Sequence, residues 1–153
     1  MKNKLIILFI SLVLGILFIL IFINNRPYNI DSIKDKIINN YSEFGLRELD
    51  LYDVSMYFGI DLNDIPSSVF LTDFVESDEN IGPFLPKHLV IVINSNKIDE
   101  YYNILKGYLD VNKSSFEDIK IINRFENAIL KRNGNKLYLI LGSNKKEIER
   151  IIK

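Results

Sequence analysis

The chain of 153 residues contains 19 basic and 20 acidic residues and no cysteine, and its formal net charge is −1. The absence of cysteine excludes disulfide bonds, thiol catalysis, thiolate metal sites and lipid attachment to a cysteine. Lys2 and Lys4 precede the first apolar segment, so the remainder of the chain carries a net charge of −3. This mild acidity argues against nucleic acid as a partner, because binding to a phosphate backbone needs clustered positive charge.

The first element is an apolar run from Leu5 to Ile23, interrupted only by Ser11 and Gly15. About 19 residues with a rise of about 1.5 Å each form a helix of about 28 Å, which matches a hydrocarbon core of about 30 Å. A cleaved secretory signal is the alternative, but its apolar region is shorter and ends at a small-residue cleavage site. Because no alanine precedes Pro27, we expect a transmembrane helix that is retained as a signal anchor.

The basic residues around this run predict its orientation, because those close to the ends of a membrane span favour the cytoplasmic side. Lys2 and Lys4 lie before the run, whereas Arg26 lies directly after it and Lys34 follows further on. We therefore expect the N-terminus inside the cytoplasm and the C-terminal domain outside it, attached to the cell membrane by a single span.

The sequence divides into two parts. Residues 1–26 are the membrane anchor and the start of a linker, and residues 27–153 are one extracytoplasmic domain, since about 125 residues suit a single core. The polar linker at 24–29 is short, so we expect the domain to lie close to the bilayer. Asn, Ile and Lys are abundant, whereas Ala128 is the only alanine, a bias that indicates an AT-rich genome such as that of a low-GC Gram-positive bacterium.

Two helices are expected at the start of the domain. The first begins at Asp31 or Ser32, either of which can cap it, and ends near Gly45. The second begins near Asp50, whose side chain can accept a hydrogen bond from an amide of the first turn, and ends at Gly59. Their apolar stripes comprise Ile33, Ile37, Ile38, Tyr41 and Phe44 in the first helix and Leu51, Val54 and Phe58 in the second.

Two strands and the clearest amphipathic helix follow. Residues 68–74 are rich in Val, Phe and Thr and predict a strand, whereas residues 76–86 are acidic and predict an exposed connection. The continuous apolar run at 89–93 is typical of a central strand buried on both faces. We expect Asn96 to cap the next helix and Asp99 to complete an approximate capping box. The apolar positions of this helix are Ile98, Tyr101, Tyr102, Leu105, Tyr108 and Leu109, and a short helix is expected around Ile119 and Ile122.

A β-hairpin is expected at 127–141. Asn133-Gly134 favours a two-residue type I′ turn, because both residues tolerate a positive φ. This turn pairs Leu130 with Leu137. The same register places Lys131 against a second lysine, which is mildly unfavourable, so a longer loop remains open. Beyond the hairpin, Asn144 is expected to cap a final helix whose apolar residues are Ile148, Ile151 and Ile152.

The segments at 89–97 and 137–145 resemble each other. In each, an apolar strand leads through Ser-Asn-Lys into a helix with an acid in its first turn. A duplication is one explanation, but capping preferences alone also predict the pattern. Together the elements predict an α+β fold: an N-terminal transmembrane helix, two helices, then a hairpin-helix-hairpin-helix unit with a mainly antiparallel four-stranded sheet.

The chain offers few candidates for chemistry, and we predict no catalytic, cofactor-binding or metal-binding residue. His88 is the only histidine, so a two-histidine metal site is excluded, and its position before a buried strand favours a structural or surface role over catalysis. Acidic residues are clustered near the middle of the chain, but they lack the ligand spacing and central glycine of an EF-hand calcium loop. A solvated loop is the favoured interpretation of this cluster, and a weak calcium site is the alternative. Its members are Asp73, Glu76, Asp78 and Glu79, preceded by Asp61 and Asp64.

Several short segments resemble those of a known protein family. They are the sequence from Tyr57 to Asp61, the strand at 89–93, and the closing stretch from Asn127 to Leu139. On these segments the chain resembles the small extracytoplasmic proteins of Gram-positive anaerobes grouped as Domain of Unknown Function 4358. The resemblance covers most of the chain from about Asp31 onward and implies an N-terminal anchor or lipoprotein signal. It implies no catalytic residue, and the missing cysteine excludes the lipoprotein version.

The leading functional hypothesis is a membrane-anchored domain that binds or scaffolds a cell-envelope protein or polymer, with the lipid bilayer as the partner of its N-terminal helix. One alternative is an envelope hydrolase that uses the acidic residues from Asp73 to Glu79. Another is a membrane-associated factor in sporulation or a similar developmental programme. The lack of a catalytic motif favours binding over an enzyme.

Overall fold

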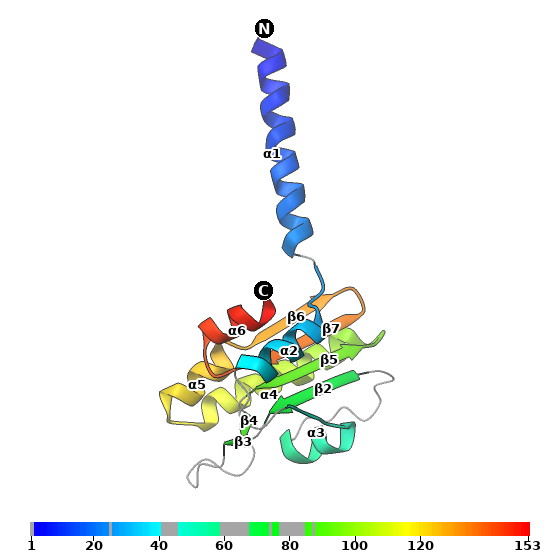
Figure 1. The fold of residues 1–153 in the computed structure, drawn as a ribbon. Coiled ribbons are helices and arrows are strands. Elements are labelled where there is room, and N and C mark those ends of the chain that lie inside the picture. The colour runs from blue at the N-terminus through cyan, green and yellow to red at the C-terminus, as the bar shows by residue number, and fades with distance from the viewer. Residues whose placement is uncertain are drawn as a thin grey trace.

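The computed structural model describes residues 2–24, 26–40, 46–58, 68–73, 75–76, 85–86 and 88–153. Only the backbone is described for residues 2–5, 24, 46, 51 and 56–58 and for the strands between 68 and 86. Helices and strands are mixed, as expected (Figure 1). The helices are α1 (Lys2–Asn24), α2 (Ile30–Asn40), α3 (Leu51–Phe58), α4 (Ile98–Ser115), α5 (Ile119–Glu126) and α6 (Lys145–Ile152). The strands are β1 (Leu46–Glu48), β2 (Ser68–Asp73), β3 (Val75–Glu76), β4 (Leu85–Pro86), β5 (Leu89–Asn94), β6 (Ile129–Asn133) and β7 (Lys136–Leu141).

The main sheet has the strand order β1-β2-β5-β7-β6, and each neighbouring pair in it is antiparallel. β3 and β4 form a separate antiparallel pair. The expectation of four strands is therefore not confirmed, because β1 extends the sheet by one strand. Its three residues, Leu46-Arg47-Glu48, are too few to display the alternation by which a strand is recognised in a sequence.

The central strand β5 is buried on both faces, as its continuous apolar sequence predicts. Leu89, Ile91 and Ile93 pack against α4 and α5, whereas Val90 and Val92 pack against α2 and α6. The neighbouring strand β7 follows the same alternation. Figure 1 shows the resulting layers, with α2 and α6 on one face of the sheet and α4 and α5 on the other.

Two apolar clusters fill these layers, and each fully buried aliphatic side chain stabilises the fold by roughly 1.5–3 kcal/mol. The larger cluster includes Val54 of α3, Ile98, Tyr101, Leu105 and Leu109 of α4, Ile121 and Phe125 of α5, and Leu137, Leu139 and Leu141 of β7. The smaller cluster contains Ile33 and Ile37 of α2, Tyr138 and Ile140 of β7, and Ile148 and Ile151 of α6. The expected stripe of α4 is thus confirmed, but Ile38 of α2 is exposed.

The N-terminal caps of α2 and α3 agree only in part with the sequence. Asp50 Oδ1 accepts a hydrogen bond from the amide of Asp53 at 2.7 Å, as expected for the start of α3. At α2, however, the amide of Ser32 donates to Asn29 Oδ1 at 3.1 Å, so the cap lies before the predicted Asp31 or Ser32. The expected stripe residues Tyr41 and Phe44 and the expected helix ends Gly45 and Gly59 lie outside the described residues.

The two Ser-Asn-Lys segments start their helices differently. Asn144 caps α6, as predicted, by accepting a hydrogen bond from the amide of Glu147 at 3.1 Å. The prediction for Asn96 is wrong, because the N-cap of α4 is Lys97 and makes no side-chain cap. Ser95 Oγ instead accepts from the amide of Lys97 at 3.1 Å.

The hairpin of β6 and β7 forms with a two-residue loop, but its register differs from the expected one. Leu130 pairs with Leu139, and Asn133 pairs with Lys136, so the loop is Gly134-Asn135. Gly134 has φ 56°, whereas Asn135 does not have a positive φ, which is the pattern of a type II′ turn rather than type I′. The shift removes the unfavourable lysine pair.

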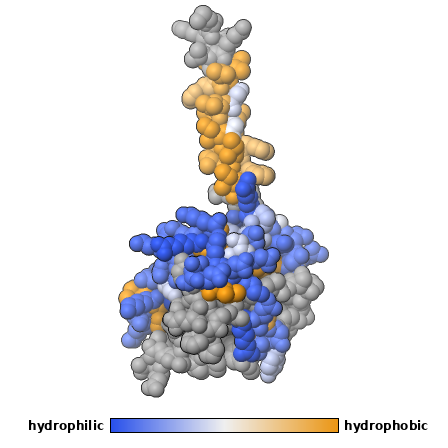
Figure 2. Space-filling view, viewed as in Figure 1, coloured by the Kyte–Doolittle hydropathy of each residue, from blue (hydrophilic) through white to orange (hydrophobic). Residues whose placement is uncertain are grey.

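The helix α1 projects away from the sheet and is long and apolar enough, over Ile6–Ile23, to cross a membrane. The side chains described in this segment are exposed. In Figure 2 it forms an apolar column above a hydrophilic surface of the domain. Ser11 Oγ donates to the carbonyl of Ile7 at 3.0 Å, so this hydroxyl is satisfied within the helix.

Candidate functional site

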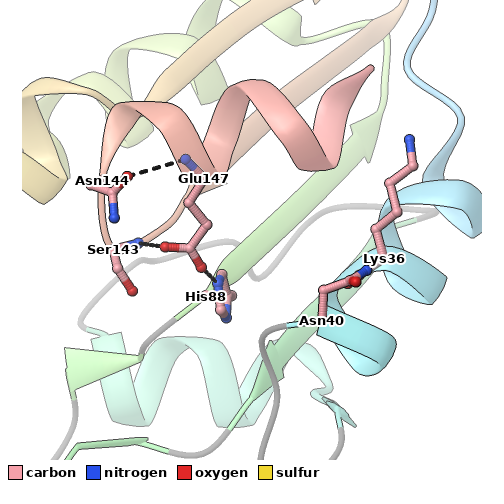
Figure 3. Close-up of polar contacts among 6 residues, drawn as sticks. All are labelled: Lys36, Asn40, His88, Ser143, Asn144 and Glu147. Atoms are coloured by element: carbon pink, nitrogen blue, oxygen red, sulfur yellow. Dashed lines mark hydrogen bonds and ion pairs between the residues drawn. The ribbon is translucent and has the colours of Figure 1, made fainter.

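The histidine of the chain forms a buried pair with a carboxylate that the sequence did not single out. His88 lies directly before β5 and is completely buried, and Glu147 lies in the first turn of α6 with 6% of its surface exposed. Their Nε2 and Oε1 atoms are in direct hydrogen-bond contact, as Figure 3 shows. Because a carboxylate oxygen only accepts, the Nε2 atom carries the hydrogen of this bond. The pair joins two segments that lie far apart in the sequence.

The start of α6 fixes the position of this carboxylate. Asn144 caps the helix through the amide of Glu147, and Glu147 Oε2 accepts a hydrogen bond from the amide of Ser143 at 3.1 Å (Figure 3). This is a capping-box arrangement in which the returning carboxylate reaches one residue further back than usual. The first turn of a helix also favours a negative charge. Both oxygens of Glu147 are therefore paired inside the fold.

Gly142 allows the chain to pass close to this pair. A Cβ atom at this position would lie 3.0 Å from Ile148 Cγ1 and 3.6 Å from His88 Cδ2. Any larger residue would push against the core side of α6. The close approach of the β7–α6 connection thus covers the imidazole.

The surroundings of Glu147 have opposing effects on its pKa. Burial alone raises the pKa of this carboxyl group, but the hydrogen bond and charge interaction with His88 and the hydrogen bonds from Ser143 lower it. The lowering effects prevail, so the pKa of Glu147 lies below its ordinary value. The group is therefore ionised at neutral pH.

This geometry suits a structural connection rather than a reaction. A catalytic acid or base must reach the substrate within hydrogen-bond distance, whereas His88 has no exposed surface. Of the two roles expected for His88, structural or surface, this burial fits only the structural one. In the part of the chain that the structure describes, no group of three or more His, Asp or Glu side chains is arranged to hold a metal ion.

A second polar group is buried between α4 and α5. Arg124 has 5% of its surface exposed. Burial raises the pKa of the nearby Tyr108, and the positive charge of Arg124 partly opposes that rise. The Tyr108 ring meets Phe125 edge-on with a centroid distance of 6.0 Å, and Phe116 stacks on the same Phe125 ring at 6.0 Å. Phe125 belongs to the larger apolar cluster, and Tyr108 and Phe116 pack against its edge, so these contacts serve packing at the boundary of the core.

The acidic residues considered for cation binding or hydrolysis cannot be located at a site. Asp73 and Glu76 end β2 and β3, and the structure describes their backbone alone. The remaining four, Asp61, Asp64, Asp78 and Glu79, lie outside the described residues.

Sequence reasoning missed Glu147, although one feature could have revealed it. The acid stands beside Ile148 on the buried side of α6, where a charged residue needs a partner.

Comparisons with known protein families, curated proteins and solved structures give no match. The functional argument therefore depends on this chain's own geometry.

Proposed function

We propose that this protein is a single-pass membrane protein whose domain, residues 27–153, lies outside the cytoplasm and binds or scaffolds a protein or polymer of the cell envelope. The observation that carries the proposal is the exposed apolar helix α1, attached to a domain of mixed helices and strands by the short segment from Arg26 to Asn29. An exposed apolar surface of this length is stable only in lipid or against another apolar surface.

The orientation rests on the basic residues at the two ends of α1. Lys2 and Lys4 precede the helix and Arg26 follows it, so the cytoplasmic side is the N-terminal one. The resemblance to the Domain of Unknown Function 4358 proteins implies the same location and supports assignment to that family.

Binding is preferred to catalysis because the group most suited to proton transfer at neutral pH is enclosed. His88 is held by Glu147 beneath the β7–α6 connection and is not accessible to a substrate. Because helices cover both faces of the main sheet, a partner that approaches either face would contact the exposed outer surfaces of these helices.

Cysteine labelling in intact cells tests the orientation, since the natural chain contains no cysteine. A membrane-impermeant maleimide should modify a Val111→Cys variant, whose position is 62% exposed on α4, without lysis. An Asn3→Cys variant, the matched control, keeps both N-terminal lysines and should react only after lysis. The reverse pattern would contradict the proposed topology, and loss of an N-terminal epitope from the membrane fraction would show cleavage of the anchor.

Photo-crosslinking tests the binding function. A crosslinking amino acid at Val111 or Ile119, both exposed apolar positions, should recover a discrete envelope protein or polymer in intact cells. Recovery of lipid or the protein itself from both positions, and of nothing else, would count against a binding or scaffolding role.

A further inference from the structure

The charges of this chain are strongly separated along its length. Residues 129–153 contain seven basic and two acidic residues, a net charge of +5, whereas residues 41–128 contain seven basic and sixteen acidic residues, a net charge of −9. The overall charge of −1 hides this separation. A domain of this kind presents different potentials on different sides.

The helix α6 displays much of the positive charge on its outer side. Lys145, Lys146 and Arg150 are exposed, and we call these three residues the basic face of α6. Glu149 is exposed among them, but Glu147 is turned inward to His88 and does not offset the surface charge. The burial of one acid thus makes the outer side of α6 more positive than its sequence suggests.

The linker connects the membrane helix to this side of the domain. Tyr28 meets Tyr138 of β7 edge-on with a centroid distance of 5.4 Å, and Lys131 Nζ of β6 lies 4.8 Å from the centre of the Tyr28 ring. The linker is therefore packed onto the β6–β7 hairpin instead of extending freely. α2, which begins at Ile30, shares an apolar cluster with α6.

The distance between the end of α1 and the domain is consequently short. Residues 25–29 span at most about 17 Å when fully extended. Figure 1 shows α6 on the side of the domain from which α1 emerges, and Figure 2 shows hydrophilic residues covering that side directly below the apolar helix. Because this span is an upper limit, the domain can approach the membrane surface to within the Debye length of about 8 Å at physiological salt, beyond which charges are largely screened.

We propose that the basic face of α6 docks on anionic phospholipid headgroups of the same bilayer that α1 spans. The inference rests on the membrane anchoring proposed above, but it holds for either orientation of the chain. Phosphodiester groups attract Lys and Arg near a membrane surface, and each basic residue strengthens binding about fivefold. Docking turns α4 and α5, whose residues 98–126 contain four basic and six acidic residues, away from the bilayer and toward a partner.

Nanodiscs that contain the full-length chain test the docking. A fluorophore is attached to a Lys153→Cys variant, in which the introduced cysteine is the only labelling site because the natural chain has no cysteine. This substitution removes a positive charge, so it does not itself favour docking on an anionic surface. A quencher on the lipid headgroup reports approach of α6. Discs of phosphatidylcholine alone are compared with discs that also contain phosphatidylglycerol.

We expect strong quenching only with phosphatidylglycerol, and a loss of quenching in concentrated salt. The variant Lys145→Gln/Lys146→Gln/Arg150→Gln should lower the ratio of docked to undocked protein at least about tenfold. The matched control, Lys97→Gln/Lys106→Gln/Lys120→Gln, removes three exposed lysines from the α4–α5 side and should retain docking. Near-ultraviolet circular dichroism of the tyrosines confirms that each variant is folded.

Three results would overturn the docking proposal. Quenching could be equal in both lipids, or the two triple variants could behave alike. In the third result, the protein in neutral discs binds soluble polyglycerol phosphate, whereas anionic lipid does not change the quenching. This result would identify a wall polymer, and not the bilayer, as the ligand of the basic face of α6. Failure of the chain to enter neutral nanodiscs would instead contradict the membrane anchoring, so the two proposals fail separately.

Discussion

Removal of the Glu147 carboxylate should strongly destabilise the domain. The substitution Glu147→Ala leaves His88 buried without this acceptor and leaves the Ser143 amide without its 3.1 Å hydrogen bond. A buried donor that loses its acceptor costs about 1–3 kcal/mol, and more where the lost partner is charged; here two donors, His88 Nε2 and the Ser143 amide, lose the same carboxylate. We therefore expect the free energy of unfolding to fall by about 3–5 kcal/mol. Glu147→Gln keeps an acceptor of similar shape and should cost about half as much.

Urea unfolding of the full-length chain in detergent micelles measures this change. The tyrosine circular dichroism reports the domain, because α1 contains no tyrosine. Glu149→Ala is the matched control, since Glu149 is exposed two residues further along α6, and it should change the free energy of unfolding by less than about 0.5 kcal/mol. A Glu147→Ala variant as stable as this control would refute the structural importance of the buried pair.

The acid dependence of stability gives an independent test of the same pair. The pKa of Glu147 is lower in the folded protein than its ordinary value of 4.5. Its contribution is therefore fully present above that value and is lost as the pH falls through the folded pKa. Glu147→Gln should flatten the decline of stability below about pH 4.5. Equal acid slopes in the two proteins would mean that the carboxylate is not stabilised by folding.

Four further substitutions test the helix caps, the close approach at Gly142 and the linker, all by urea unfolding. Asn144→Ala should cost about 1 kcal/mol by removing the cap, whereas Asn96→Ala should cost less than about 0.5 kcal/mol because Asn96 does not cap α4; equal losses would contradict the assigned caps. Gly142→Ala should cost about 1–3 kcal/mol, because its Cβ would lie 3.0 Å from Ile148 Cγ1, and an unchanged midpoint would show that α6 can shift. Tyr28→Leu should cost about 1 kcal/mol through loss of its ring contacts, and no change would mean that the linker is not held by the hairpin.

Sequence reasoning found the central strand and the main helix because their apolar patterns are long. The run at 89–93 is hydrophobic at every position, and only a strand covered on both faces buries all of it. The hairpin register was harder to predict. The expected and observed pairings of Leu130 differ by two residues, and a shift of two keeps every side chain on its face. Hydrophobicity therefore could not distinguish them, and the turn geometry at Gly134 decided the register.

The buried pair was less predictable than the fold, because its two members come from distant segments. His88 was noted as the only histidine, but its partner lies 59 residues further along the chain, in a sequence rich in exposed charges. Likewise, Asn96 and Asn144 stand in the same Ser-Asn-Lys sequence, yet only Asn144 caps its helix. The local sequence gives both asparagines the same preference for the N-cap position. At Asn144, where the cap forms, the acid three residues later, Glu147, also makes a tertiary contact with the buried His88.

The layered core also sets the order in which the domain can fold. The apolar residues of α2, such as Ile37, pack in one cluster with Ile148 and Ile151 of α6, which are made about 110 residues later. At 5–20 residues per second, ribosomal synthesis of this interval takes about 6–20 s. During that time α2 has no α6 to cover its apolar face. The domain therefore completes its fold only after its last helix has been made.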